Sequence, residues 1–170
     1  SAYLKKFIDV EAKLVDFNVE LNLISEFNYK DHYEYCKKFL KQLDFKPDFI
    51  CISSLFSPSF DNFMDCGKAS KELWPKSLVI GGGNIPTNDS KYIYDNLNCD
   101  FFDGLCIGEG EKPLLELLAA DDKKKYLEEA MCWATQKKLK SPFPFISKHN
   151  FIENLDEIPF YDYSLCDMDR

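Results

Sequence analysis

The chain has 170 residues, of which 45% are hydrophobic and 15% aromatic, and its formal net charge at pH 7 is −8. This length fits one domain with a hydrophobic core, and the composition excludes a chain that is mostly disordered. The acidic balance argues against non-specific binding to nucleic-acid phosphates, which needs a basic surface. Because no apolar run is long enough to cross a membrane and no signal peptide is present, we expect a cytoplasmic protein.

The N-terminal third predicts a helix, a strand and a second helix. Apolar residues at positions 3, 4, 7 and 8 have helical spacing, and no N-cap precedes them. Residues 13–19 alternate between polar and apolar side chains, which is typical of a strand. Asn28 has the character of an N-cap, so we expect a helix over residues 29–43. The buried stripe of that helix is predicted to contain Tyr33, Cys36, Phe39, Leu40 and Leu43.

The middle of the chain alternates strands with helices. Residues 49–55 form a near-continuous apolar run, which is typical of a parallel strand covered on both faces. The elements that follow are a helix over 59–73, a strand over 77–80, a helix over 88–97, a strand over 101–107 and a helix with Pro113 in its first turn that reaches Ala120. This order predicts a doubly wound, flavodoxin-like (Rossmann-like) α/β fold with a parallel sheet.

The C-terminal part breaks this pattern. The charged run at residues 121–125 is interpreted as a solvated turn, and residues 130–135 predict a short strand. Residues 141–170 contain scattered aromatic side chains and three prolines with little periodicity, which indicates an extended tail. We therefore expect an α/β domain over residues 1–125 and a tail and linker over residues 126–170.

Three predicted strands end in small residues. The strand over 77–80 runs into Gly81, Gly82 and Gly83, the strand over 101–107 runs into Gly108-Glu109-Gly110, and the strand over 49–55 contains Ser53 and Ser54 before Leu55. Glycine permits a sharp turn and close approach of another group to the backbone. Ligands of open α/β sheets bind at the carboxyl ends of the strands, so these three ends predict one binding surface.

Cysteines and histidines give no metal-binding spacing along the chain. The seven cysteines include no CxxC pair, and neither a zinc nor an iron–sulfur pattern is found. Cys51 and Cys106 lie inside apolar runs, where a thiol acts as a small buried hydrophobic group. A reduced compartment fits this usage. His32 and His149 are interpreted as ordinary surface residues.

Residues 52–55 (ISSL), 79–87 (VIGGGNIPT) and 107–114 (IGEGEKPL) together resemble the N-terminal cobalamin-binding domain of radical S-adenosylmethionine enzymes. Residues 154–163 (NLDEIPFYDY) are similar to the linker that joins this domain to the catalytic barrel. The resemblance covers most of the chain. It implies a cobalamin-binding module, with the radical domain, its 4Fe–4S cluster and S-adenosylmethionine supplied by the same full-length protein, as in a methyltransferase.

The resemblance also implies which residues contact the corrinoid. Ser53 is expected to hydrogen-bond the benzimidazole end and Leu55 to pack on it, while Thr87 contacts a phosphate or ribose. A side chain at the triple glycine would collide with the nucleotide tail. The complete expected set is Ser53, Ser54, Leu55, Gly81, Gly82, Gly83, Thr87, Gly108, Glu109 and Gly110.

Three departures from the family accompany this resemblance. The aspartate–x–histidine–x–x–glycine signature, which supplies a cobalt ligand in related mutases, is absent, and His32 lies on a predicted helix. The CxxxCxxC triplet is also absent, so the chain alone is not expected to cleave S-adenosylmethionine. The family's first strand should precede Ala2 and is not in the sequence. We therefore expect a fragment of a longer protein with an exposed sheet edge that favours homo-oligomers.

Alternative interpretations remain for these residues. The glycines can form plain tight turns in a flavodoxin-like docking domain without cofactor, or a phosphate-binding loop of a nucleotide- or flavin-binding domain. The match to GxGxxG is weak because Pro113 replaces the third glycine. Glu111 is interpreted as a favourable charge at a helix N-terminus. Asp16 and Asp103 suggest a receiver-type phospho-acceptor, but the acidic pair and lysine of such domains are not visible.

Overall fold

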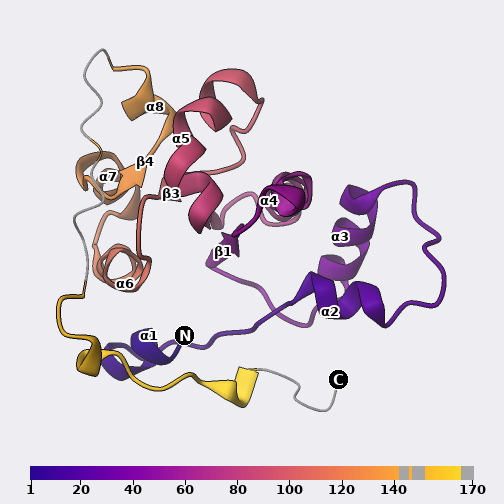
Figure 1. The fold of residues 1–170 in the computed structure, drawn as a ribbon, viewed down its shortest axis with the longest axis horizontal. Helices are drawn as coiled ribbons and strands as arrows, with labels where there is room; N and C mark the ends of the chain where they lie inside the picture. The colour runs from indigo at the N-terminus through magenta and orange to yellow at the C-terminus, as the bar shows by residue number, and fades with distance from the viewer. Residues whose placement is uncertain (142–145, 147–151, 166–170) are drawn as a thin grey trace. The chain divides into compact units, whose positions relative to one another are not determined.

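The computed structural model describes residues 1–141, 146 and 152–165. The chain divides into two compact units, one formed by Ser1–Tyr29 with Ile152–Arg170 and the other by Lys30–Phe151. Figure 1 shows the order of the elements along the chain. The division that the sequence suggested after residue 125 falls inside helix α7 (Lys123–Glu129) of the second unit.

Within the described residues, the second unit is built on a four-stranded sheet. Its strands are β1 (Phe49–Ser53), β2 (Leu78–Gly82), β3 (Gly104–Cys106) and β4 (Trp133–Ala134), in the spatial order β1-β2-β3-β4. The first three strands are parallel, with Ser53 opposite Gly82 and Gly81 opposite Leu105, while β4 is antiparallel to β3. This topology confirms the expected α/β fold.

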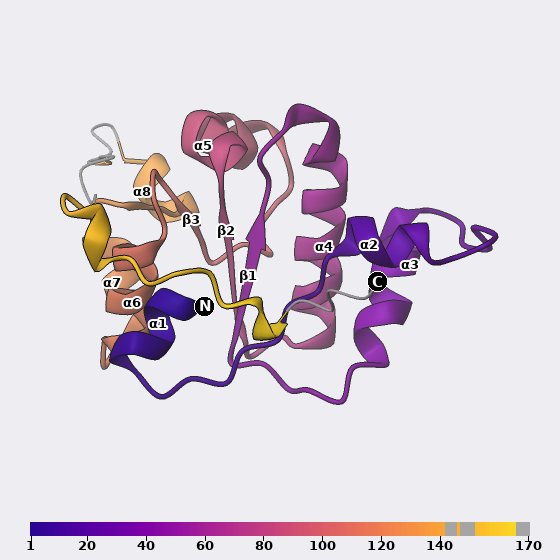
Figure 2. The same ribbon diagram turned by 60° about the horizontal axis from the view of Figure 1, so that its bottom comes forward.

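Helices cover both faces of this sheet. They are α4 (Phe60–Leu73), α5 (Asn84–Asn96), α6 (Glu111–Ala119), α7 and α8 (Gln136–Leu139), while α3 (His32–Lys41) packs against α4. Val79 and Leu105 pack with residues of α4 and α5, whereas Ile80 and Cys106 pack with residues of α6 and α7. Because successive side chains of a strand point to opposite faces, each strand contributes to both cores. Figure 2 shows α4 on one side of the strands and α6 with α7 on the other.

The first unit joins the two ends of the chain. It contains α1 (Ala2–Phe7), α2 (Phe17–Asn22) and two short 3₁₀ turns, Leu155–Glu157 and Tyr163–Leu165. Lys5 Nζ lies 2.7 Å from the Asp162 carboxylate, and Lys6 Nζ donates to the carbonyl of Glu157 at 2.9 Å. The hydrogen bond from Lys5 lowers the pKa of the Asp162 carboxyl below its usual value. The expected tail therefore returns to α1 within this unit.

Two N-terminal predictions are wrong because aspartates cap helices. Residues 13–16 are not a strand, since the Asp16 carboxylate accepts from the backbone N–H groups of Asn18 and Val19 and begins α2. Asn28 does not cap α3, because Asp31 accepts from Glu34 N at the true start of that helix. A local side-chain acceptor for otherwise unpaired N–H groups outweighs a short polar–apolar alternation.

Two further boundaries also differ from expectation. Helix α5 begins at Asn84, directly after the glycines and four residues before the predicted start, and it kinks at Asp89. The charged run is not a solvated turn, because Asp122 caps α7 and the apolar side chain of Leu127 packs into the core. Sequence periodicity missed α7 because only one of its residues is buried.

Strand β1 is less covered than its apolar sequence predicts. Ile50 and Ile52 pack against the cluster that includes residues of α4, and Phe49 packs against the cluster on the opposite face. Cys51, however, is exposed. β1 is the end strand of the described sheet, so it has a neighbouring strand on one side only. The second cluster includes Phe49 but not Cys51, and the prediction of a buried Cys51 is therefore wrong.

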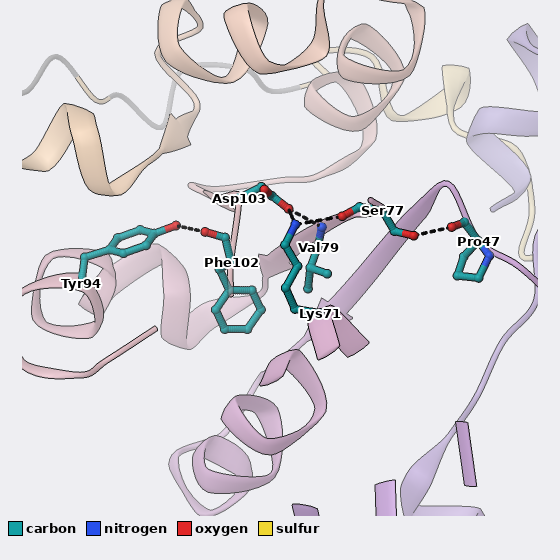
Figure 3. Close-up of polar contacts among 7 residues, drawn as sticks. All are labelled: Pro47, Lys71, Ser77, Val79, Tyr94, Phe102 and Asp103. Carbon is teal, nitrogen blue, oxygen red and sulfur yellow. Dashed lines mark hydrogen bonds and ion pairs between the residues drawn. The ribbon is translucent and has the colours of Figure 1, made fainter. Parts of the chain in front are cut away.

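A polar cluster joins the amino ends of β2 and β3. Lys71 Nζ lies 2.7 Å from Asp103 Oδ2 and 2.9 Å from the carbonyl of Ser77, and Val79 N donates to the same carboxylate oxygen at 2.8 Å. Ser77 Oγ donates to the carbonyl of Pro47 at 2.6 Å (Figure 3). Asp103 thus has a structural role at the edge opposite to the one that a phospho-acceptor would occupy.

No helix in the described part of the chain is both long and apolar enough to cross a membrane.

Candidate functional site

The three predicted strand ends meet at one edge of the sheet. Ser53 lies opposite Gly82 in the β1–β2 ladder, and Ser54 N donates to the carbonyl of Gly82 at 3.0 Å. Gly108 N donates to Thr87 Oγ1 at 3.0 Å and so connects the third strand end to α5. The fold therefore brings together backbone from three segments, of which the first and last, at Ser53 and Gly108, are 55 residues apart in sequence.

The three consecutive glycines have different surroundings. A Cβ atom on Gly81 would lie 2.6 Å from Leu105 Cδ2 and 2.6 Å from Phe63 Cζ, both in the core. A Cβ atom on Gly83 would lie 2.5 Å from the carbonyl oxygen of Ser54. A Cβ atom on Gly82, in contrast, would meet only Cys106 Cβ, at 3.8 Å. The chain itself requires glycine at 81 and 83, whereas at 82 it leaves space.

Gly83 also fixes the start of α5. Its φ of 98° and ψ of −171° lie in a region that residues with a side chain rarely adopt. This turn lets Ile85 N donate to the carbonyl of Ser54 at 3.2 Å and Thr87 N donate to the carbonyl of Gly83 at 3.1 Å. The hydroxyl of Thr87 is thereby held beside Gly108.

The two serines of the first strand end differ in exposure. Ser54 is 1% exposed, and its hydroxyl pairs with Ser59 Oγ at 3.2 Å. Ser53 is exposed, and it is followed by two large apolar residues that are also exposed, Leu55 at 55% and Phe56 at 71%. Ser54 thus supports the loop, while Ser53, Leu55 and Phe56 are available to a ligand.

Phe56 is a candidate that the sequence reasoning missed. It directly precedes the 3₁₀ turn Ser57–Ser59, whose N-cap it forms in an extended conformation. An aromatic residue that follows a predicted strand end and stands before a Ser-Pro turn was the available signal. Large exposed apolar side chains next to a ligand edge provide contact area for an apolar ring.

The third strand end is formed almost entirely by backbone. Gly108 has a φ of 90°, Glu109 is exposed, and a Cβ atom on Gly110 would meet no atom within 4 Å. Gly110 is the N-cap of α6 and makes no side-chain capping bond. Glu111 occupies the first turn of α6, where its charge is favourable for the helix dipole, as expected.

The described residues of this edge are suited to binding and not to acid–base or nucleophilic catalysis. Burial raises the pKa of the Cys106 thiol to about 12, so this sulfur is protonated at neutral pH and is a poor nucleophile. His32 lies elsewhere, between α3 and α4, with its Nδ1 3.4 Å from Asp65. His149 lies outside the described residues.

Comparison of the chain with known protein families identifies one family that it matches. A family model described as the B12 binding domain matches residues 2–118, which include all three strand ends. No curated protein and no solved structure matches the chain.

Proposed function

The chain belongs to the B12-binding domain family, and we propose, from the resemblance of residues 52–55, 79–87, 107–114 and 154–163, that it is the cobalamin-binding module of a radical S-adenosylmethionine methyltransferase. The corrinoid would be held against the carboxyl edge of the sheet in the second unit. The space beside Gly82 is the observation that carries this placement, since the chain leaves a Cβ position open there while it fills those of Gly81 and Gly83.

The residues around Gly82 fit the nucleotide tail of cobalamin. Leu55 and Phe56 offer exposed apolar area for the benzimidazole ring. Ser53 is exposed and lies opposite Gly82, and its hydroxyl can hydrogen-bond the benzimidazole. Thr87 accepts from Gly108 N, and its own hydroxyl proton can be donated to a phosphate or ribose oxygen. The exposed Glu109 lies at the next strand end, where corrin amides would be within reach.

Cobalamin, when bound, supplies a cobalt-held methyl group as its chemistry. The described residues at the strand ends would bind and orient the cofactor through its nucleotide tail, since they offer no activated nucleophile and no histidine. The absence of CxxxCxxC from the sequence means that a 4Fe–4S cluster and S-adenosylmethionine would be held by a separate radical domain. The resemblance of residues 154–163 to the family's linker supports a domain that follows it.

Titration of hydroxocobalamin and methylcobalamin, followed by visible absorption, tests the binding proposal. We expect saturable binding with a change in the corrin spectrum. Gly82→Leu should weaken binding at least tenfold because its side chain fills the space for the tail. Lys76→Leu, at an exposed position at the amino edge of the sheet, is the control and should leave binding unchanged. Equal affinity of Gly82→Leu and the wild type would refute the placement.

The same titration separates the other functions considered for this fold. A folded protein that leaves the corrin spectrum unchanged would indicate a docking domain without cofactor. Binding of flavin mononucleotide or a dinucleotide in place of cobalamin would indicate a nucleotide site. The radical partner is tested in the gene that encodes the chain, because a continuation without CxxxCxxC would contradict it.

We further propose that the free edge of β1 pairs with another copy of the chain. β1 is the end strand of the described sheet, and an unpaired parallel edge strand is a ready template for strand addition. Light scattering of the purified chain tests this proposal. The backbone N–H of Ser54 faces β2, so by strand alternation that of Cys51 faces the free edge. A dimer that disappears when Cys51 is replaced by proline supports the proposal, and a monomer at all concentrations contradicts it.

A further inference from the structure

A cluster of soft ligands lies between α3 and α4 of the second unit. His32, Cys36 and Cys66 each offer one ligand atom, and all three atoms lie within 4.8 Å of one another. None of these residues belongs to the strand ends described above. No metal-binding spacing is visible along the chain because Cys66 is thirty residues away from Cys36, a separation that no short ligand motif contains.

The geometry of α3 presents two of these ligands together. His32 and Cys36 are one helical turn apart, so their side chains lie on the same face of α3. Cys66 comes from the middle of α4, which packs against α3. Cys36 is 0% and Cys66 6% exposed, and they are held in place by this packing.

The distances within the cluster are close to those of a tetrahedral metal centre. Cys36 Sγ lies 3.3 Å from Cys66 Sγ and 3.6 Å from His32 Nε2. Zinc–sulfur bonds of about 2.3 Å at tetrahedral angles place two sulfurs about 3.8 Å apart. The two sulfurs need to move apart by only a few tenths of an ångström to accept an ion.

Asp65 completes the arrangement. Its Oδ2 lies 3.4 Å from His32 Nδ1, so it can accept a hydrogen bond from the Nδ1–H group and leave the Nε2 lone pair to a metal. Histidines that bind metals commonly donate their second ring N–H to a carboxylate in this way. The side chain of His32 is 14% exposed, so water can reach the fourth ligand position.

We propose that His32, Cys36 and Cys66 form a Zn²⁺ site that fastens α3 to α4, with Asp65 orienting the histidine. Two thiolates and one imidazole are ligands that zinc prefers, whereas magnesium and calcium select oxygen ligands. The site is independent of the cobalamin edge, and it requires no oxidant, since binding displaces thiol protons and leaves both sulfurs reduced.

Titration of the reduced full chain with Co²⁺, under argon and with a phosphine reductant, tests the site. We expect one equivalent of Co²⁺ to give the intense visible bands of a tetrahedral centre and a thiolate-to-cobalt charge-transfer band. One equivalent of Zn²⁺ should then remove both. Absence of these bands from the folded chain would overturn the proposal.

Variants assign the ligands. Cys36→Ser and Cys66→Ser should each abolish the charge-transfer band or reduce it by about half, and Cys99→Ser, a buried cysteine elsewhere in the core, should retain it. If either serine variant fails to fold, His32→Ala decides, because His32 lies at the start of α3 and is not part of the core. We expect His32→Ala to weaken Co²⁺ binding at least tenfold, and unchanged binding would overturn the site.

Asp65→Asn tests the positioning role separately. It keeps all three ligands and should weaken Zn²⁺ binding by about tenfold to a hundredfold in competition with a chromogenic chelator. If the Co²⁺ bands of this variant keep their wavelengths but need a higher Co²⁺ concentration to reach half of their full intensity, Asp65 is a positioning residue. An unchanged midpoint would remove it from the site.

Discussion

The two edges of one sheet differ sharply in this protein. At the amino edge, Lys71 and Asp103 pair with each other and with backbone groups of β2, so polar side chains occupy the space between the strands (Figure 3). At the carboxyl edge, the strands end in glycines, and Ser53 and Leu55 are exposed. The closed edge stabilises the fold, while the open edge leaves backbone available to a ligand.

The difference follows from what each glycine or side chain contacts. Asp103 Oδ2 accepts hydrogen bonds from Lys71 Nζ and from Val79 N, so this carboxylate is held by α4 and β2. Gly82 has a neighbouring atom only at 3.8 Å. Within the open edge, Gly81 and Gly83 differ from Gly82 in the same way, because packing leaves no room for a side chain at 81 or 83.

Gly83→Ala is expected to give the largest loss of stability. The alanine Cβ would be 2.5 Å from the carbonyl oxygen of Ser54, which is backbone and cannot move aside, and a φ of 98° is unfavourable for it. The free energy of unfolding should fall by about 3 kcal/mol or more, measured by urea denaturation followed by circular dichroism. Gly110→Ala is the control, and equal midpoints for the two variants would contradict the assignment.

Gly81→Ala is expected to give the second largest loss of stability. Its Cβ would overlap side-chain atoms of Leu105 and Phe63, which can shift slightly within the core. We expect a loss of about 1 to 3 kcal/mol in the same urea experiment. Gly82→Ala places its Cβ in open space and should cost little stability. An equally small loss for Gly81→Ala would contradict the different packing of Gly81 and Gly82.

Asp103→Asn tests the closed edge. It removes a charge that pairs with Lys71 and accepts from Val79 N, at side-chain exposures of 19% for Asp103 and 24% for Lys71. The loss of stability should be about 1 to 2 kcal/mol, since partial exposure screens the pair. Cobalamin affinity of the folded variant should stay unchanged, and a weakened affinity would show that the two edges are coupled.

Ser53→Ala should have the smallest effect on folding. The side chain is exposed, so the free energy of unfolding should change by less than about 0.5 kcal/mol. The loss of one hydrogen bond should weaken cobalamin binding by about fivefold, measured by absorption titration. Ser54→Ala is the matched comparison, because its buried hydroxyl pairs with Ser59 and its loss should affect stability more than binding.

Much of the fold could be predicted from local sequence patterns. The apolar runs of β1 and β2, the turn at Pro75 after α4 and Pro113 in the first turn of α6 all have local causes, and the structure confirms them. The capped starts of α2 and α3 were mistaken because Asp16 and Asp31 compete with neighbouring signals of similar strength. Such competition is decided by a hydrogen bond to N–H groups that the sequence alone does not rank.

By itself, the sequence determined the alternation of strands and helices, the small residues at three strand ends and the resemblance to a cobalamin-binding domain. Tertiary structure alone decided that Gly81 and Gly83 serve packing while Gly82 stays open, that Asp103 pairs with Lys71, and that Cys66 meets Cys36. Local patterns depend on neighbours a few residues away, whereas these contacts join segments brought together only when the helices pack on the sheet.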